Sequence, residues 1–188
     1  MKRFLMIFST LAITAVIGLA LLAGFGSRKT TYAKYKAIGS TVNWHDPSES
    51  QPYPNLKKES NLWIYVSTKK QRVYLHGNGQ VIYKMYCSTG EASSPTPKGT
   101  FHIQAQRGKS FYNAASGEGA NYWVSWLDHG VYLFHSVPVT KTGQYIPSQA
   151  EKLGTPASHG CVRLTVAEAY RMYKNIPYAT KVVIKLKN

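Results

Sequence analysis

Short segments of alternating apolar and polar residues run from Asn61 to the end of the chain, and they constrain the fold more than any other feature. The segments LWIYVS (62–67) and KVVIKL (181–186) are rich in β-branched and aromatic residues. GNG at 77–79 and DHG at 128–130 each separate two more such segments, as hairpin turns do. The sequence therefore predicts a mainly β domain, a β-rich α+β fold built as a sandwich or barrel.

One helix is predicted late in the domain. The residues TVAE (165–168) form a capping box, in which the Thr side chain caps the first turn and the Glu side chain reaches back. Apolar residues then recur at helical spacing as far as Tyr173, and Pro177 ends the pattern. We expect this helix to pack on the sheet.

The chain begins with an apolar segment. Residues 4–25 carry no charge and are long enough to cross a bilayer core of about 30 Å. Lys2 and Arg3 precede them, which favours a cytoplasmic N-terminus, and no A-x-A cleavage site follows. We expect residues 1–25 to be an uncleaved signal anchor that holds the domain at the cell membrane, outside the cytoplasm. If the segment is cleaved, the domain is secreted instead.

The rest of the chain divides by composition. Residues 26–60 show no sustained periodicity and are rich in Ser, Pro and charged residues, which predicts an extracytoplasmic linker. Residues 61–188 are enough for one domain with a single core.

The charge of the chain favours an anionic partner. It carries 23 Lys and Arg against 8 Asp and Glu, a net charge of +15, which suits an anionic cell-wall or membrane surface. No Lys/Arg-rich run or nucleic-acid motif is present, so no nucleic-acid partner is expected. A non-enzymatic wall-binding module, in which the basic surface does the binding, is the alternative that charge alone leaves open.

The motif SHGC (158–161) places a cysteine four residues before the predicted helix. A nucleophilic cysteine needs a lowered pKa, a base within reach and donors for an oxyanion. The positive end of the helix favours a thiolate at Cys161, and the amides of Gly160 and Cys161 could supply the donors. His135 ends the apolar segment VYLFHS (131–136) and is the candidate base. His159 competes for that role, but it lies across a tight turn from the cysteine.

The second cysteine has a different setting. Cys87 shares one face of a predicted strand with Val81, Tyr83 and Met85, which indicates a core thiol.

Two alternatives from other classes fit less well. A zinc site could combine His129, His135, His159 and Cys161, but only the last two have a close ligand spacing, and we expect no metal or other cofactor. In a sortase-type transpeptidase the Cys commonly follows a Thr and the Arg lies a strand further on, whereas Arg163 is two residues from Cys161.

Taken together, these motifs resemble a known family. FHS (134–136) and SHGCVRL (158–164), preceded by STG (88–90) and TPKGTF (96–101), look like the L,D-transpeptidase catalytic domain of the YkuD type. The resemblance covers residues 61–188. It implies an L,D-transpeptidase-like β-sandwich or barrel with one helix after the catalytic cysteine, acting on peptidoglycan stem peptides.

The resemblance also implies roles by position. Cys161 is the nucleophile, His135 is its base, and Ser136 orients the imidazole mainly through its backbone carbonyl. The remaining motif residues shape the oxyanion site: Ser158, His159 and Gly160. Arg163 is a candidate for binding a substrate carboxylate, with a structural ion pair as the alternative.

The implied reaction is acyl transfer. The cysteine attacks the bond between the third, L-centred residue of a tetrapeptide stem and its terminal D-Ala, which leaves. An amine of a neighbouring stem then accepts the acyl group and forms a 3→3 cross-link, as in cell-wall biogenesis and the maintenance of cell shape. Water as the only acceptor would make the chain an L,D-carboxypeptidase. Enzymes of this type are carbapenem targets.

Overall fold

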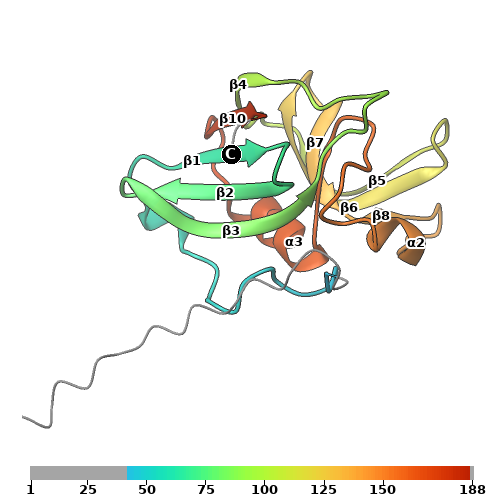
Figure 1. Ribbon diagram of the computed structural model, residues 1–188, viewed down its shortest axis with the longest axis horizontal. Coiled ribbons are helices and arrows are strands. Elements are labelled where there is room, and N and C mark those ends of the chain that lie inside the picture. The colour runs from blue at the N-terminus through green and yellow to red at the C-terminus, as the bar shows by residue number, and fades with distance from the viewer. Residues whose placement is uncertain (1–41, 187–188) are drawn as a thin grey trace, which may run out of the picture. The chain divides into compact units, whose positions relative to one another are not determined.

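The computed structural model describes residues 42–186 (Figure 1). Its strands form one sheet in the order β4-β10-β1-β2-β3-β9-β7-β6-β5, with β8 paired to β6. The strands are β1 (Trp63–Ser67), β2 (Arg72–Gly77), β3 (Gln80–Ser88), β4 (Gly99–His102), β5 (Arg107–Asn113), β6 (Glu118–Leu127), β7 (Tyr132–Ser136), β8 (Pro138–Val139), β9 (Val162–Leu164) and β10 (Lys181–Lys185). The helical segments are η1 (Leu56–Lys58), α2 (Pro147–Ala150) and α3 (Val166–Asn175). The predicted β-rich class is confirmed.

The sheet has two halves that meet at β3 and β9. Strands β1 to β3 lie on one side of Figure 1 and β5 to β7 on the other, with α3 beneath them. Strand β9 pairs antiparallel with β3, where Cys87 faces Leu164, and parallel with β7. This three-residue strand therefore closes the sheet between the halves.

The alternation in the sequence produces the core. On β2 and β3 every second side chain is buried, among them Val73, Leu75, Tyr83 and Met85. Cys87 is completely buried in the same cluster and free of a disulfide, which confirms the predicted core thiol. Burial raises its pKa well above the ordinary range for a thiol.

Both predicted turns connect neighbouring strands. At the β2–β3 turn, Asn78 and Gly79 have φ of 52° and 78°, the left-handed values that a tight hairpin needs. The β6–β7 turn has three successive positive φ values at residues 128–130, namely 53°, 47° and 114°.

The predicted helix is present as α3. Thr165 caps it, because its hydroxyl accepts the Glu168 N–H at 3.2 Å, and the helix ends before Pro177. One detail differs from the helical pattern: Tyr170 is 46% exposed, whereas Glu168 is fully buried.

Residues 42–60 bury Glu168, and here the predicted linker needs correction. The Ser48 backbone N–H and hydroxyl donate to the two carboxylate oxygens of Glu168, each at 2.8 Å.

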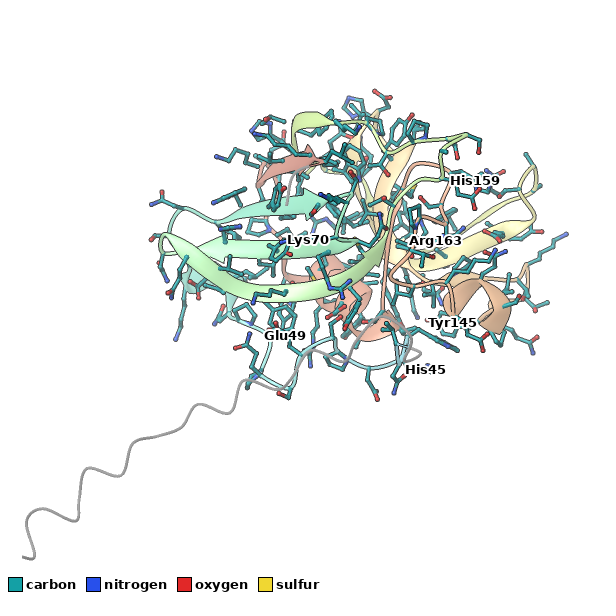
Figure 2. The ribbon with its side chains drawn as sticks, in the orientation of Figure 1. His45, Glu49, Lys70, Tyr145, His159 and Arg163 are labelled. Atoms are coloured by element: carbon teal, nitrogen blue, oxygen red, sulfur yellow. The ribbon has the colours of Figure 1, made fainter. Side chains whose placement is uncertain are left out.

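Other residues of the same segment pack against the domain. Leu56 lies in the main core, and Trp44 packs against Tyr145 at a ring separation of 5.5 Å. Figure 2 shows the neighbouring His45 beside Tyr145. These contacts join segments far apart in the sequence, so local periodicity gives no sign of them. The folded unit thus includes residues 42–60 as well as the predicted domain.

The predicted membrane anchor lies outside the described residues. Among residues 42–186, no helix is both long and apolar enough to cross a membrane.

The buried Glu168 predicts a pH-dependent stability. Burial raises its pKa from 4.5 to about 7, and hydrogen bonds from Ser48 and Thr165 with the charge of Arg171 oppose this only in part. The native state therefore holds the proton more tightly than the unfolded chain. The resulting stabilisation is complete below the unfolded pKa and is lost as the pH rises through about 7. Glu168 alone should cost on the order of 2–3 kcal/mol of unfolding free energy between pH 4 and pH 8. Buried His135, whose pKa is lowered to about 4, changes the stability in the opposite direction over part of that range, so the contribution of Glu168 is read by comparing urea unfolding of the wild type with that of a variant.

The variant Glu168→Gln should lack this contribution, since it keeps the hydrogen-bonding shape without the charge, and between pH 4 and pH 8 it should lose less stability than the wild type by about that amount. Glu151→Gln, at an exposed carboxyl, is the matched control and should behave as the wild type. The same change in unfolding free energy between pH 4 and pH 8 in Glu168→Gln and in the wild type would contradict the assignment.

Candidate active site

His135 lies near the end of β7 with only 6% of its surface exposed. Its Nδ1 lies 2.6 Å from the backbone oxygen of Ser136. A carbonyl oxygen only accepts, so Nδ1 carries the proton and Nε2 keeps a lone pair for a base. Ser136 thus orients the ring through its carbonyl, while its hydroxyl donates to the Val137 carbonyl at 2.8 Å.

The parallel pairing of β7 and β9 places the cysteine next to the histidine. In this pairing His135 lies opposite Arg163 and Phe134 opposite Val162. Side chains alternate along each strand, so Leu133 and His135 on β7 share a face with Cys161 and Arg163. All four line one cavity of about 490 Å³. The structure therefore brings together two predicted residues that are 26 positions apart in the sequence.

Hydrogen bonds of the Ser158 side chain stabilise the turn before Cys161. The Ser158 hydroxyl donates to the Cys161 carbonyl at 2.6 Å and accepts the Gly160 N–H at 3.2 Å. Gly160 has φ of 112°, and a Cβ atom there would lie 2.9 Å from the Tyr132 ring. Only glycine fits this position without strain. In the free protein the Gly160 amide already donates to Ser158, so of the two amides expected to face an oxyanion the Cys161 amide is the better candidate.

Electrostatics make both partners neutral in the free protein. Burial raises the pKa of Cys161 to about 11, and a backbone hydrogen bond at Leu133 and the charge of Arg163 offset this only in part. Burial and the charge of Arg163 lower the pKa of His135 to about 4, against the opposing hydrogen bond to Ser136. The Cys161 thiol lies 3.5 Å from the Val131 carbonyl, to which it donates. A thiol and a neutral imidazole are therefore expected near neutral pH.

The helix does not produce the thiolate that the sequence suggested, for two reasons. The three residues of β9 stand between Cys161 and α3, and an extended strand advances about 3.3 Å per residue. The first amides of α3 are also occupied, since Val166 and Ala167 donate to the carbonyls of Trp44 and His45 at 2.9 and 3.2 Å.

Arg163 forms an ion pair in the cavity wall. Its Nη2 lies 2.9 Å from Oε2 of Glu118, and its Nη1 donates to Gln149 at 3.3 Å. Of the two roles considered for Arg163, substrate binding and a structural ion pair, the free protein shows the ion pair. The buried Nε atom has no partner among the described residues. Sequence reasoning missed Glu118, because the two charges lie 45 residues apart and nothing local marks the acid.

The other histidines of the zinc alternative do not gather around the cysteine. His159 lines the cavity but is exposed, and Figure 2 shows it apart from Arg163. His129 lines a different cavity. Within residues 42–186, no group of three or more His, Cys, Asp or Glu side chains is arranged to hold a metal ion.

This sheet, with an oriented histidine on one strand and a cysteine directly before the neighbouring parallel strand, is typical of one class of protein. The sequence profile of the L,D-transpeptidase catalytic domain, YkuD, matches residues 61–184. The chain belongs to the YkuD L,D-transpeptidase family.

Individual relatives agree with this assignment. A Bacillus subtilis (strain 168) protein named "Putative L,D-transpeptidase YciB" is 46% identical over 152 residues, which cover 79% of this chain and 77% of the relative. A second protein of that organism, "Putative L,D-transpeptidase YqjB", is 22% identical and covers 74% of each chain.

Solved structures share the fold. The LD transpeptidase LdtMt1 in complex with imipenem has a TM-score of 0.55 and 21% identity, over 66% of this chain and 59% of that one. An L,D-transpeptidase from Mycobacterium tuberculosis H37Rv has a TM-score of 0.54 and 20% identity, over 66% and 57%. The chain thus spans a little over half the length of these solved proteins.

The neutral state of Cys161 can be tested by alkylation. Because the thiolate is the reactive form, the rate with iodoacetamide should rise about tenfold per pH unit from pH 7 to 9. Mass spectrometry after timed quenching would follow the label. Cys161→Ala should remove the labelling, since Cys87 is fully buried. A plateau below pH 8 would instead show a preformed thiolate.

Proposed function

We propose that this protein is a peptidoglycan L,D-transpeptidase with Cys161 as its nucleophile. The proposal rests on the common face formed at the pairing of β7 with β9, where His135 and Cys161 line one cavity. The imidazole of His135 is already oriented there by the Ser136 carbonyl. A non-enzymatic wall-binding module would give no reason for this arrangement.

The first half-reaction forms a thioester. Cys161 Sγ turns from the Val131 carbonyl and attacks the carbonyl carbon between the third stem residue and the terminal D-Ala. The thiol proton passes to His135 Nε2, because both groups are neutral before the attack. The Cys161 amide supports the oxyanion. His135 then returns the proton to the D-Ala nitrogen, the C–N bond breaks, and D-Ala leaves.

The second half-reaction regenerates the thiol. The side-chain amine of a neighbouring stem attacks the thioester and loses a proton to His135, which passes it to the departing sulfur. An amide bond forms, the C–S bond breaks, and the product is a 3→3 cross-link. Water in place of the amine gives hydrolysis, which is an L,D-carboxypeptidase reaction.

Arg163 is proposed to help hold a substrate carboxylate. It lines the same cavity, and Glu118 and Gln149 hold its guanidinium in place. These two bonds use one N–H of Nη1 and one of Nη2, so the guanidinium is preoriented with a further N–H on each nitrogen for a substrate carboxylate.

We also propose that the domain works outside the cytoplasm. The apolar segment at 4–25 would anchor it in the cell membrane, and the net charge of +15 would favour an anionic wall or membrane surface. Peptidoglycan lies on that side of the membrane.

Acylation by imipenem tests the nucleophile, since the solved LdtMt1 structure holds that carbapenem. We expect the intact mass of the wild-type chain to rise by one acyl adduct, and a tetrapeptide stem to give loss of D-Ala. Cys161→Ala should give neither product, while Cys87→Ser should retain both. An equal adduct on Cys161→Ala would exclude the proposed mechanism.

Arg163→Lys tests the carboxylate contact, because Lys keeps the charge but loses the planar set of donors. We expect about a tenfold rise in KM for the tetrapeptide donor with a smaller change in kcat. Glu118→Gln is the matched comparison, as it breaks the ion pair and keeps the guanidinium. If Arg163 serves only that pair, both variants will lose thermal stability and Arg163→Lys will leave KM unchanged.

A further inference from the structure

A second cavity of about 390 Å³ lies beside the catalytic one and has no part in the proposed mechanism. The end of β4, the loop toward β5, the end of β6 and the residues after α3 form it, and β4 with its following loop lies near the top of Figure 1. The rings of Phe101 and Tyr178 line it, and Trp126, which is only 1% exposed, borders it from the core. Tyr178 is 69% exposed, a large area for an aromatic side chain with no core role.

Two glutamines in this cavity, Gln104 and Gln106, are oriented through their side-chain oxygens, which leaves their NH₂ groups available as donors. Gln104 Oε1 accepts from the Ser125 hydroxyl at 2.8 Å and from the His129 N–H at 2.9 Å. Gln106 Oε1 lies 3.4 Å from His129 Nδ1. The Oε1 atoms of both glutamines thus have partners within the protein, whereas neither NH₂ group donates a hydrogen bond among residues 42–186. Oriented donors of this kind bind a ligand at low entropic cost.

Strained backbone surrounds the same cavity. His129 and Ala179 line it with φ of 47° and 61°, and Asp128 beside them has φ of 53°. Left-handed conformations of non-glycine residues cost on the order of 1 kcal/mol each and concentrate at functional sites.

The β6–β7 turn connects the two cavities. Leu127 and His129 line the second cavity, whereas Gly130 and Val131 line the first. The Val131 carbonyl accepts the Cys161 thiol. A polymeric substrate held at Cys161 therefore needs to cross only this turn to reach the second cavity.

The chemistry of the lining selects a neutral ligand. Among the described residues that form the second cavity there is no carboxylate, ammonium or guanidinium group. Stem peptides carry such charges and would find no partner there. Aromatic faces with amide donors suit a sugar ring with hydroxyl and N-acetyl groups instead.

We propose that this cavity binds the N-acetylated sugar backbone of the glycan strand whose stem reacts at Cys161. The proposal rests on the proposed function, since it takes peptidoglycan as the substrate. It adds a glycan subsite next to the peptide subsite, so that the enzyme recognises a stem in its attached form.

Ligand-observed NMR on the full chain tests the binding directly. We expect a saturable saturation-transfer signal with the tetramer of N-acetylglucosamine and a weaker one with the glucose tetramer, which lacks the N-acetyl groups. Tyr178→Ala and Gln106→Ala should each weaken binding of the first sugar about fivefold. Tyr170→Ala, at an exposed tyrosine outside the cavity, is the control and should bind as the wild type.

Turnover gives a second readout. The ratio of the rate on glycan-linked stems to the rate on free tetrapeptide should fall in Tyr178→Ala and Gln106→Ala and stay unchanged in Tyr170→Ala. Absence of sugar binding, equal binding of the two tetramers, or binding insensitive to both cavity variants would overturn the proposal. Loss of the proposed function shows separately, as failure of imipenem to acylate Cys161.

Discussion

The parallel pairing of β7 with β9 is the interaction on which the rest of the structure depends. Strand β9 has only three residues, yet it fills the place between β3 and β7 and so completes the sheet. Because the register sets His135 opposite Arg163, the side chains of Leu133, His135 and Cys161 come to one face. A shift of one residue would turn Cys161 and Arg163 to the other face of the sheet. The core and the site therefore share one constraint.

Burial has a second consequence, which concerns protons. The same packing that fixes the imidazole and the thiol removes water from them, and this favours the uncharged form of each. The proposed chemistry must therefore move a proton at the moment of attack. Arg163 adds a positive charge that also disfavours an imidazolium, while Glu118 neutralises part of it. The cavity wall thus carries one positive and one negative side chain that pair with each other.

Much of this could be predicted from the sequence. The strands follow from alternation, α3 from its Thr165 cap, and the pair of His135 and Cys161 from a strand end and a motif. The sequence predicts a linker over residues 26–60, because the contacts that residues 42–60 make with Glu168 and the core are visible only in three dimensions. The expected thiolate failed for the same reason, since the carbonyls of Trp44 and His45 occupy the helix amides.

The sequence by itself determined which segments become strands, where the helix begins and which cysteine is chemically interesting. Those properties depend mainly on residues that are close to one another in the sequence. Tertiary structure alone decided the protonation of the pair, the partner of Arg163 and the existence of a second cavity. Each of these depends on desolvation or on groups brought together from distant positions, such as Glu118 and Arg163. Burial and long-range pairing are properties of the packed molecule, and no local pattern encodes them.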